Sequence, residues 1–180
     1  NEKLYIGKRE EVFVYNESTG NFDLFYHLAG KNITLSCLHL DKNKNLWMGT
    51  TSNGIYCLSE DKSLSRPVTK GNITSIYEDS SNELWIGSWE EGLYRVKTDG
   101  NIENLRHNPM NTNSLCSNFV RSCCEDNSGD LWIGTFNGLN RYDRETGKFH
   151  LYTANGNSPD GLTHSSIWCI VKDGQGTIWL

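Results

Sequence analysis

The stretch Asp126-Asn-Ser-Gly-Asp-Leu-Trp-Ile-Gly-Thr135 decides the fold of this chain, because it recurs along the sequence. Further copies are Asp41-Lys-Asn-Lys-Asn-Leu-Trp-Met-Gly-Thr50, Asp79-Ser-Ser-Asn-Glu-Leu-Trp-Ile-Gly-Ser88 and Asp173-Gly-Gln-Gly-Thr-Ile-Trp-Leu180, with a degenerate copy at Leu4-Tyr-Ile-Gly7. In each of the four full copies, Trp follows Asp by six residues. A fixed phrase of this kind indicates a repeat protein.

The spacing of the aromatic anchors identifies the type of repeat. Tyr5, Trp47, Trp85, Trp132 and Trp179 are 42, 38, 47 and 47 residues apart. Each period contains an apolar first strand, a hairpin turn opened by Asp, a second strand with the Trp, a third strand and an outer strand. Four strands per period of about 40 residues are typical of β-propeller blades, whereas leucine-rich and β-helix repeats are shorter and a β-sandwich requires no fixed phrase. We therefore predict an all-β chain of four-stranded antiparallel repeats, a fragment of about four blades from a larger propeller.

The hairpin turn carries its own signal at the fourth position. This position is Lys44, Asn82, Gly129 and Gly176 in the four copies. Gly and Asn tolerate the positive φ that such a turn needs, so we expect the left-handed conformation there.

Blade boundaries follow from the repeat. We expect blades at 71–116 and 31–70, a blade at 117–163, and partial blades at 1–30 and 164–180. Residues 167–172 could pair with 4–7, although 177–180 would compete for the same position. Since exposed strand edges favour association, we expect an incompletely closed arc that forms a homodimer.

Composition excludes several classes. With 20 Asn, 17 Gly and only two Ala, the chain lacks the residues of a helical bundle. A net charge of −5 without a basic stripe argues against nucleic-acid binding. The chain contains no apolar run of 18 residues, so we predict no membrane span. The apolar, strand-like end at Thr177–Leu180 leads us to expect a piece of a longer protein.

The copy that begins at Glu125 and continues to Asp143 resembles the two-component regulator propeller repeat. The polar stretches His107–Leu115 and Asn157–Leu162 resemble the loops between blades in that family. Such repeats form the extracytoplasmic sensor region of hybrid two-component systems of Bacteroides-type bacteria. The resemblance implies a periplasmic module of a membrane-anchored parent, continuous with the rest of its sensor propeller and followed by a histidine kinase and response regulator. It also implies a glycan fragment as ligand and polysaccharide-utilisation genes as the output.

Residues that keep the repeat are better explained by structure than by function. We expect the repeated indoles to fill the core between blades, and the repeated carboxylates to accept hydrogen bonds from the amides of their own turns. The indoles are Trp47, Trp85, Trp132 and Trp179, and the carboxylates are Asp41, Asp79, Asp126 and Asp173. We predict no metal, no cofactor and no structural disulfide, because the six Cys lack metal-binding spacing and occupy positions typical of buried thiols.

Residues that break the repeat are the better candidates for ligand binding. Trp89 is an additional Trp in a turn, and Trp168 and Arg121 stand where other copies have Ser36 and Thr74. Further polar or aromatic candidates, on first strands or in the loops before them, are His39, Tyr77, Asn118 and His164. Packing against a neighbouring blade remains the alternative for each of these residues.

The sequence thus predicts a non-catalytic ligand-sensing module. A propeller enzyme, such as a polysaccharide lyase or glycoside hydrolase, is the alternative from another class, and a protein-interaction scaffold is the third. A glycosidase needs two carboxyl groups that face one site, but the recurring Asp residues are already explained by turns.

Overall fold

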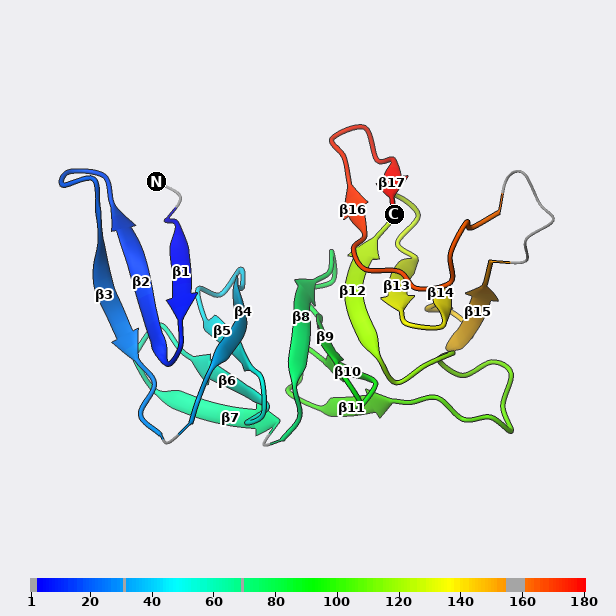
Figure 1. The fold of residues 1–180 in the computed structure, drawn as a ribbon, viewed down its shortest axis with the longest axis horizontal. Helices are drawn as coiled ribbons and strands as arrows, with labels where there is room; N and C mark the ends of the chain where they lie inside the picture. The colour runs from blue at the N-terminus through cyan, green and yellow to red at the C-terminus, as the bar shows by residue number, and fades with distance from the viewer. Residues whose placement is uncertain (1–2, 31, 69, 155–160) are drawn as a thin grey trace. The chain divides into compact units, whose positions relative to one another are not determined.

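The computed structural model describes residues 3–30, 32–68, 70–154 and 161–180 (Figure 1). These residues form antiparallel sheets joined by turns and loops. Among them there is no helix with the length and apolar character needed to cross a membrane. The chain divides into two compact units, Asn1–Ile73 and Thr74–Leu180.

The first unit contains two sheets, and in each the strands pair in chain order. The three-stranded sheet comprises β1 (Tyr5–Lys8), β2 (Glu11–Asn16) and β3 (Asn21–His27). The four-stranded sheet comprises β4 (Leu35–Leu40), β5 (Leu46–Thr50), β6 (Ile55–Leu58) and β7 (Leu64–Val68). A core that includes Val12, Leu28, Met48 and Leu58 is buried here.

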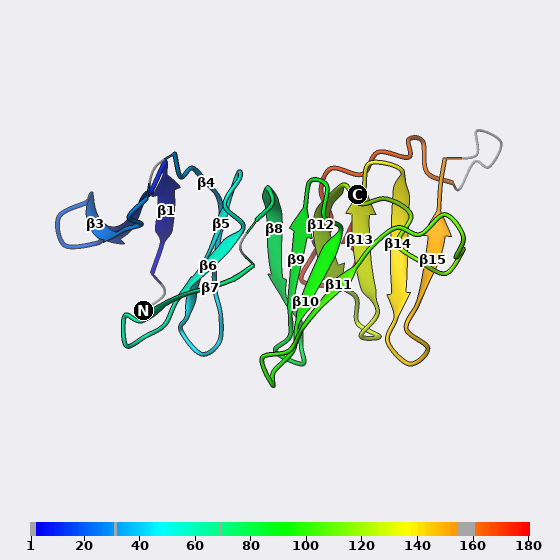
Figure 2. The same ribbon diagram turned by 90° about the horizontal axis from the view of Figure 1, so that it is seen from below.

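The second unit repeats the same meander, as Figure 2 shows for the strands of each sheet. One sheet is β8 (Ile73–Glu78), which starts at the unit boundary, with β9 (Leu84–Ser88), β10 (Leu93–Val96) and β11 (Ile102–Leu105). The next is β12 (Val120–Glu125), β13 (Leu131–Thr135), β14 (Gly138–Asp143) and β15 (Lys148–Tyr152). A two-stranded sheet follows, β16 (Val171–Lys172) and β17 (Ile178–Trp179).

These four-stranded antiparallel sheets confirm the predicted propeller blades. Residues 167–172 were expected to act as one strand, but the strand β16 comprises only Val171–Lys172. The strand β17 has only two residues, so β16 finds pairing partners only for Val171 and Lys172. The pairing of residues 4–7 with 167–172 would join the two units, and it stays a prediction, as does the homodimer.

The hairpin turns explain the six-residue interval between Asp and Trp. In each copy one carboxylate oxygen accepts backbone N–H groups of the turn, as Asp79 Oδ1 does from Glu83 N at 2.9 Å. The other oxygen accepts the indole N–H, with Trp85 Nε1 2.7 Å from Asp79 Oδ2. The same bond is 2.8 Å at Trp47, 2.7 Å at Trp132 and 2.9 Å at Trp179. The repeated Asp therefore links a turn to the core, a role wider than the predicted turn alone.

Positive φ occurs at the fourth turn position in all four copies, as predicted. The angles are 63° at Lys44, 62° at Asn82, 86° at Gly129 and 89° at Gly176. A Lys at this position shows that the Asp-capped turn imposes the left-handed conformation even on a residue that does not favour it.

The glycine that stands two residues after the Trp of a second strand allows neighbouring sheets to approach closely. A Cβ on Gly134 would lie 2.8 Å from a methyl of Ile167, and one on Gly87 would lie 2.9 Å from a methyl of Val120. Ile167 and Val120 each precede or begin the first strand of the following repeat. The glycine is thus required by sheet packing.

The residue after this glycine is Thr50, Ser88 or Thr135, and its hydroxyl closes the next turn. It donates to the carbonyl oxygen of Gly54, Gly92 or Gly138 at 2.7, 2.8 and 2.8 Å, respectively. Ser88 makes the bond as well as Thr does, so the departure from the repeat at this position costs no hydrogen bond.

The predicted burial of the repeated indoles depends on the sheet. Trp85 is 0% exposed and Trp47 is 8% exposed, while Trp132 is half-buried and packs beside Tyr152. For Trp179 the prediction of a core position is wrong, since this residue is 61% exposed. In the described residues its sheet has two strands only, and no third or outer strand covers the ring.

All six cysteines are free thiols, but Cys169 is exposed, so the expectation of a buried thiol is wrong at that position. Burial raises the pKa of Cys37 and Cys57 to about 11 in each case. It also raises the pKa of Cys123. The thiols of Cys37, Cys57 and Cys123 therefore remain protonated at neutral pH and behave as small apolar side chains.

Candidate functional site

A cluster of aromatic rings around one arginine lies in the second unit. Trp89 follows β9, Arg121 is on β12, and Trp168 precedes β16. The guanidinium carbon of Arg121 lies 3.5 Å from the ring centroid of Trp168 and 4.6 Å from that of Trp89. The guanidinium therefore contacts both indoles, a cation–π arrangement that orients the charge and the two rings together.

A β-bulge occurs at Arg121, as it does at the equivalent residue Ser36 of β4. The register between β12 and β13 shifts between Val120 and Ser122, so Arg121 has no paired residue on β13. A bulge of this type redirects a side chain out of the regular alternation of the strand.

The same repeat position has a structural role in other blades. Ser36 Oγ donates to the carbonyl oxygen of Ile73 at 2.6 Å, and Thr74 Oγ1 donates to that of Val120 at 2.7 Å. Each hydroxyl thus bonds the first strand of its sheet to the start of the next repeat. Arg121 makes no such bond, and its Nε is buried without a hydrogen-bond partner among the described residues. The arginine replaces a structural hydroxyl with an unused donor.

Two phenylalanines extend the cluster. Phe119 packs edge-on against Trp89 with ring centroids 5.5 Å apart, and Phe136 lies 6.3 Å from Phe119. Trp168 and Phe136 are the most open members, 69% and 50% exposed. We call Trp89, Phe119, Arg121, Phe136 and Trp168 the aromatic–arginine cluster. An exposed row of rings with a cation offers flat apolar faces and a charge-assisted hydrogen-bond donor to a ligand.

The sequence criterion selected three of these five residues, and the structure brings those three together. It did not select Phe119 or Phe136. A signal for Phe119 was available, because the corresponding positions are Thr34, Asn72 and Ser166, all small and polar. An aromatic residue in place of a small polar one has no role in the repeat itself.

The remaining predicted candidates lie outside the cluster. Tyr77 is partly buried, packs against two hydrophobic clusters of the second unit, and burial raises the pKa of its phenol. Asn118 accepts a hydrogen bond from His107 N at 2.8 Å and so holds a loop. His39 belongs to the first unit, on β4, where it pairs with Trp47 in the register. His164 is exposed.

Metal ligation finds no support in the described parts of the chain, where no group of three or more His, Cys, Asp or Glu side chains could hold an ion.

Comparison with known proteins identifies the repeat. A family model described as "Two component regulator propeller" matches residues 27–52, 67–90, 114–137 and 161–180, together just over half of the chain. The chain belongs to the two component regulator propeller family. The four matched segments each contain one copy of the Asp-to-Trp phrase.

Solved structures show the same fold at low identity. A structure described as the extracellular domain of the hybrid two component system BT4673 from B. thetaiotaomicron has a TM-score of 0.79 and 22% identity, over 99% of this chain and 24% of that one. The extracellular domain of the hybrid two component system BT3049 from the same organism has a TM-score of 0.52 and 23% identity, over 98% and 28%. The WD40 beta propeller domain of Doa1 has a TM-score of 0.68 and 14% identity, over 99% and 56%.

The chain therefore spans about a quarter of the two Bacteroides structures. No curated protein matches it.

Proposed function

We propose that this propeller is a non-catalytic, ligand-sensing part of a hybrid two-component system, and that it binds a glycan fragment at the aromatic–arginine cluster. In this proposal the parent protein is anchored in the inner membrane, and the propeller lies in the periplasm. Binding is passed to a histidine kinase and response regulator that control polysaccharide-utilisation genes. Membership of the two component regulator propeller family supports the sensor role.

One observation carries the choice of site. Arg121 stands at a repeat position where Ser36 and Thr74 have a structural hydrogen bond, and its guanidinium lies against the two indoles. Sugars present apolar C–H faces that stack on indoles and hydroxyl or acidic groups that accept hydrogen bonds from a guanidinium. The cluster supplies both kinds of contact on one surface.

The recurring carboxylates favour a sensor over a glycosidase. Asp79, Asp126 and their equivalents accept hydrogen bonds from their turns and from a Trp indole. These hydrogen bonds hold the repeated Asp carboxylates in place as structural acceptors. A glycosidase instead needs its two carboxyl groups directed at one substrate.

A glycan array followed by calorimetric titration of the best ligand tests the proposal. We expect Trp168→Ala and Arg121→Met each to weaken binding by at least about tenfold, because each removes a charge-assisted or stacking contact. The melting temperature should be unchanged for Trp168→Ala, since this ring is exposed. Trp179→Ala is the matched control, an exposed Trp outside the cluster, and should bind as the unaltered protein does.

Three results would overturn parts of the proposal. Full binding by both cluster variants would exclude the site. Cleavage of an arrayed glycan would favour the enzyme alternative, and an array without ligands would favour a protein-interaction scaffold.

A further inference from the structure

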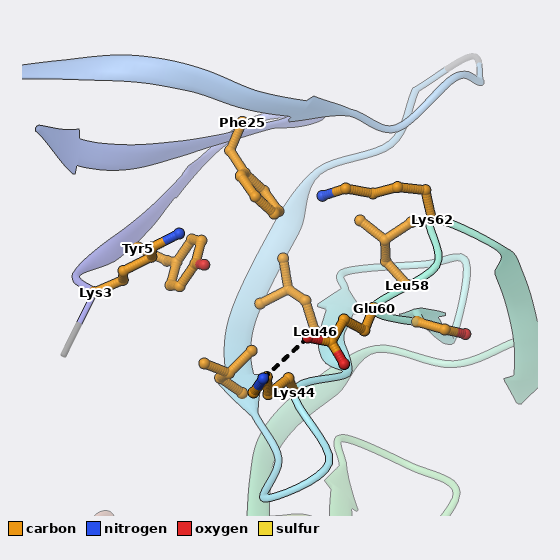
Figure 3. Close-up of a pocket in the computed structure, with 10 residues that line it drawn as sticks. Lys3, Tyr5, Phe25, Lys44, Leu46, Leu58, Glu60 and Lys62 are labelled. Atoms are coloured by element: carbon orange, nitrogen blue, oxygen red, sulfur yellow. Dashed lines mark hydrogen bonds and ion pairs between the residues drawn. The ribbon is translucent and has the colours of Figure 1, made fainter. Parts of the chain in front are cut away.

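A cavity of about 470 Å³ opens between the two sheets of the first unit (Figure 3). Its apolar wall includes Tyr5 from β1, Phe25 from β3 and Leu58 from β6. The rings of Tyr5 and Phe25 meet edge to face, with centroids 5.1 Å apart. The volume lies within the range of ligand pockets, about 300–1,000 Å³.

The residues beside this cavity differ from those at the same repeat positions in the second unit. In the second unit Trp85 of β9 packs against Tyr142 of β14, with ring centroids 5.4 Å apart. The strand register makes Leu58 the equivalent of Tyr142, because Leu46 pairs with Leu58 as Leu131 pairs with Tyr142. Tyr5 stands in place of the Trp. Both members of the pair are thus smaller in the first unit, and the cavity lies beside them.

The charges around the opening also differ from the repeat. Arg144 stands two residues after Tyr142, and its equivalent after Leu58 is Glu60. Lysines Lys3, Lys44 and Lys62 surround the cavity together with this single carboxylate.

Only one of the three lysines is neutralised by that carboxylate. Lys44 Nζ lies 3.0 Å from Glu60 Oε1, shown as a dashed line in Figure 3. Lys62 Nζ lies 4.0 Å from the centroid of the Phe25 ring. Among the described residues neither Lys62 nor Lys3 pairs with a carboxylate. In the described part of the chain, the opening therefore carries the charges of Lys3 and Lys62 without a paired carboxylate, beside two aromatic rings.

We propose that this cavity binds a small ring-bearing anion, with the ring against Tyr5 and Phe25 and a carboxylate or sulfate group at Lys62. The aromatic pair supplies an apolar face, and the Lys62 ammonium group supplies a charge-assisted hydrogen bond to the acid group. This site goes beyond the proposed function, since it lies in the first unit and shares no residue with the aromatic–arginine cluster.

Calorimetric titration with benzoate and with glucuronate tests the site and distinguishes an aromatic acid from a sugar acid. We expect saturable 1:1 binding of at least one of them, and no binding of neutral methyl glucoside. Inorganic sulfate should bind at least about tenfold more weakly than the better acid, because it lacks the ring. Equal binding of sulfate would overturn the proposal, as would an absence of binding by both acids.

Variants locate the site. We expect Lys62→Met to weaken binding by about tenfold or more, whereas Lys8→Met, an exposed lysine on β1 outside the cavity, should have no effect. Leu58→Tyr restores the bulkier residue of the other unit and should abolish binding by filling the cavity. If Leu58→Tyr does not fold, Lys62→Met against Lys8→Met still decides, and equal affinity of these two variants overturns the proposal.

The cavity of the first unit and the aromatic–arginine cluster can be tested separately. Arg121→Met should leave the binding of benzoate and glucuronate unchanged, and a loss of binding in that variant would overturn the assignment to the first unit.

Discussion

The interface between β1–β3 and β4–β7 and the interface between β8–β11 and β12–β15 come from the same repeat but have different interiors. In the second, Trp85 is 0% exposed and packs against Tyr142, while Arg144 lies 2.9 Å from Asp79 and 3.0 Å from Glu125. In the first, a Tyr and a Leu leave a cavity, and the charged groups at the rim are exposed.

This difference shows that the repeat fixes the strands and turns but not the filling between sheets. The turn Asp, the close-packing Gly and the strand register recur in both units. They keep the backbone in place when the side chains between the sheets change. A blade interface can therefore lose its aromatic filling and become a cavity without losing the fold.

The largest effect is expected from removing the indole of the filled interface. Trp85→Ala should lower the free energy of unfolding by about 4 kcal/mol, because it removes a fully buried ring and leaves a cavity. Chemical denaturation monitored by circular dichroism measures the change. Trp179→Ala, at the exposed copy, should change the stability by less than about 0.5 kcal/mol, and equal costs for the two would contradict the comparison.

A smaller effect is expected at the ion pairs. Arg144→Met should cost about 3 kcal/mol, because it leaves the carboxylates of Asp79 and Glu125 buried without their cation. Glu60→Gln removes the equivalent charge from the first unit, where Lys44 is exposed to solvent, and should cost less than about 0.5 kcal/mol. Similar denaturation midpoints for both variants would show that the two interfaces do not differ in this way.

The smallest effect is expected from removing the Asp–Trp hydrogen bond while keeping an aromatic ring in place. The indole N–H of Trp179 lowers the pKa of Asp173 below its ordinary value, with further lowering by the backbone N–H of Thr177. Because the folded pKa is below the unfolded one, this contribution to stability is present above about pH 4 and is lost as the pH falls through the folded value.

Trp179→Phe should therefore raise the pKa of Asp173, as measured by NMR titration of its carboxyl carbon. The pKa of Asp99, which is lowered chiefly by the backbone N–H of Asn101, is the internal control and should not move. An unchanged pKa of Asp173 in the variant would show that the indole bond does not contribute.

Much of the candidate cluster could be anticipated from residues that break the repeat. Trp89, Arg121 and Trp168 were selected in this way, and the structure places the guanidinium against both indoles. The contact itself could not be predicted, because it depends on how side chains from three separate segments of the chain meet in space. Phe119 was missed because an aromatic residue beside a strand is more often part of a core.

The sequence by itself determined the all-β fold, the blade period and the conformation of the Asp-capped turns, because these depend on local patterns that recur several times. Only the tertiary structure decided which indoles are buried, what accepts their N–H groups, and where an interface is left open. Burial and cavities depend on which side chains meet from different sheets. Trp132 and Trp85 occupy the same repeat position, yet one is half-buried and the other is fully enclosed by its neighbours.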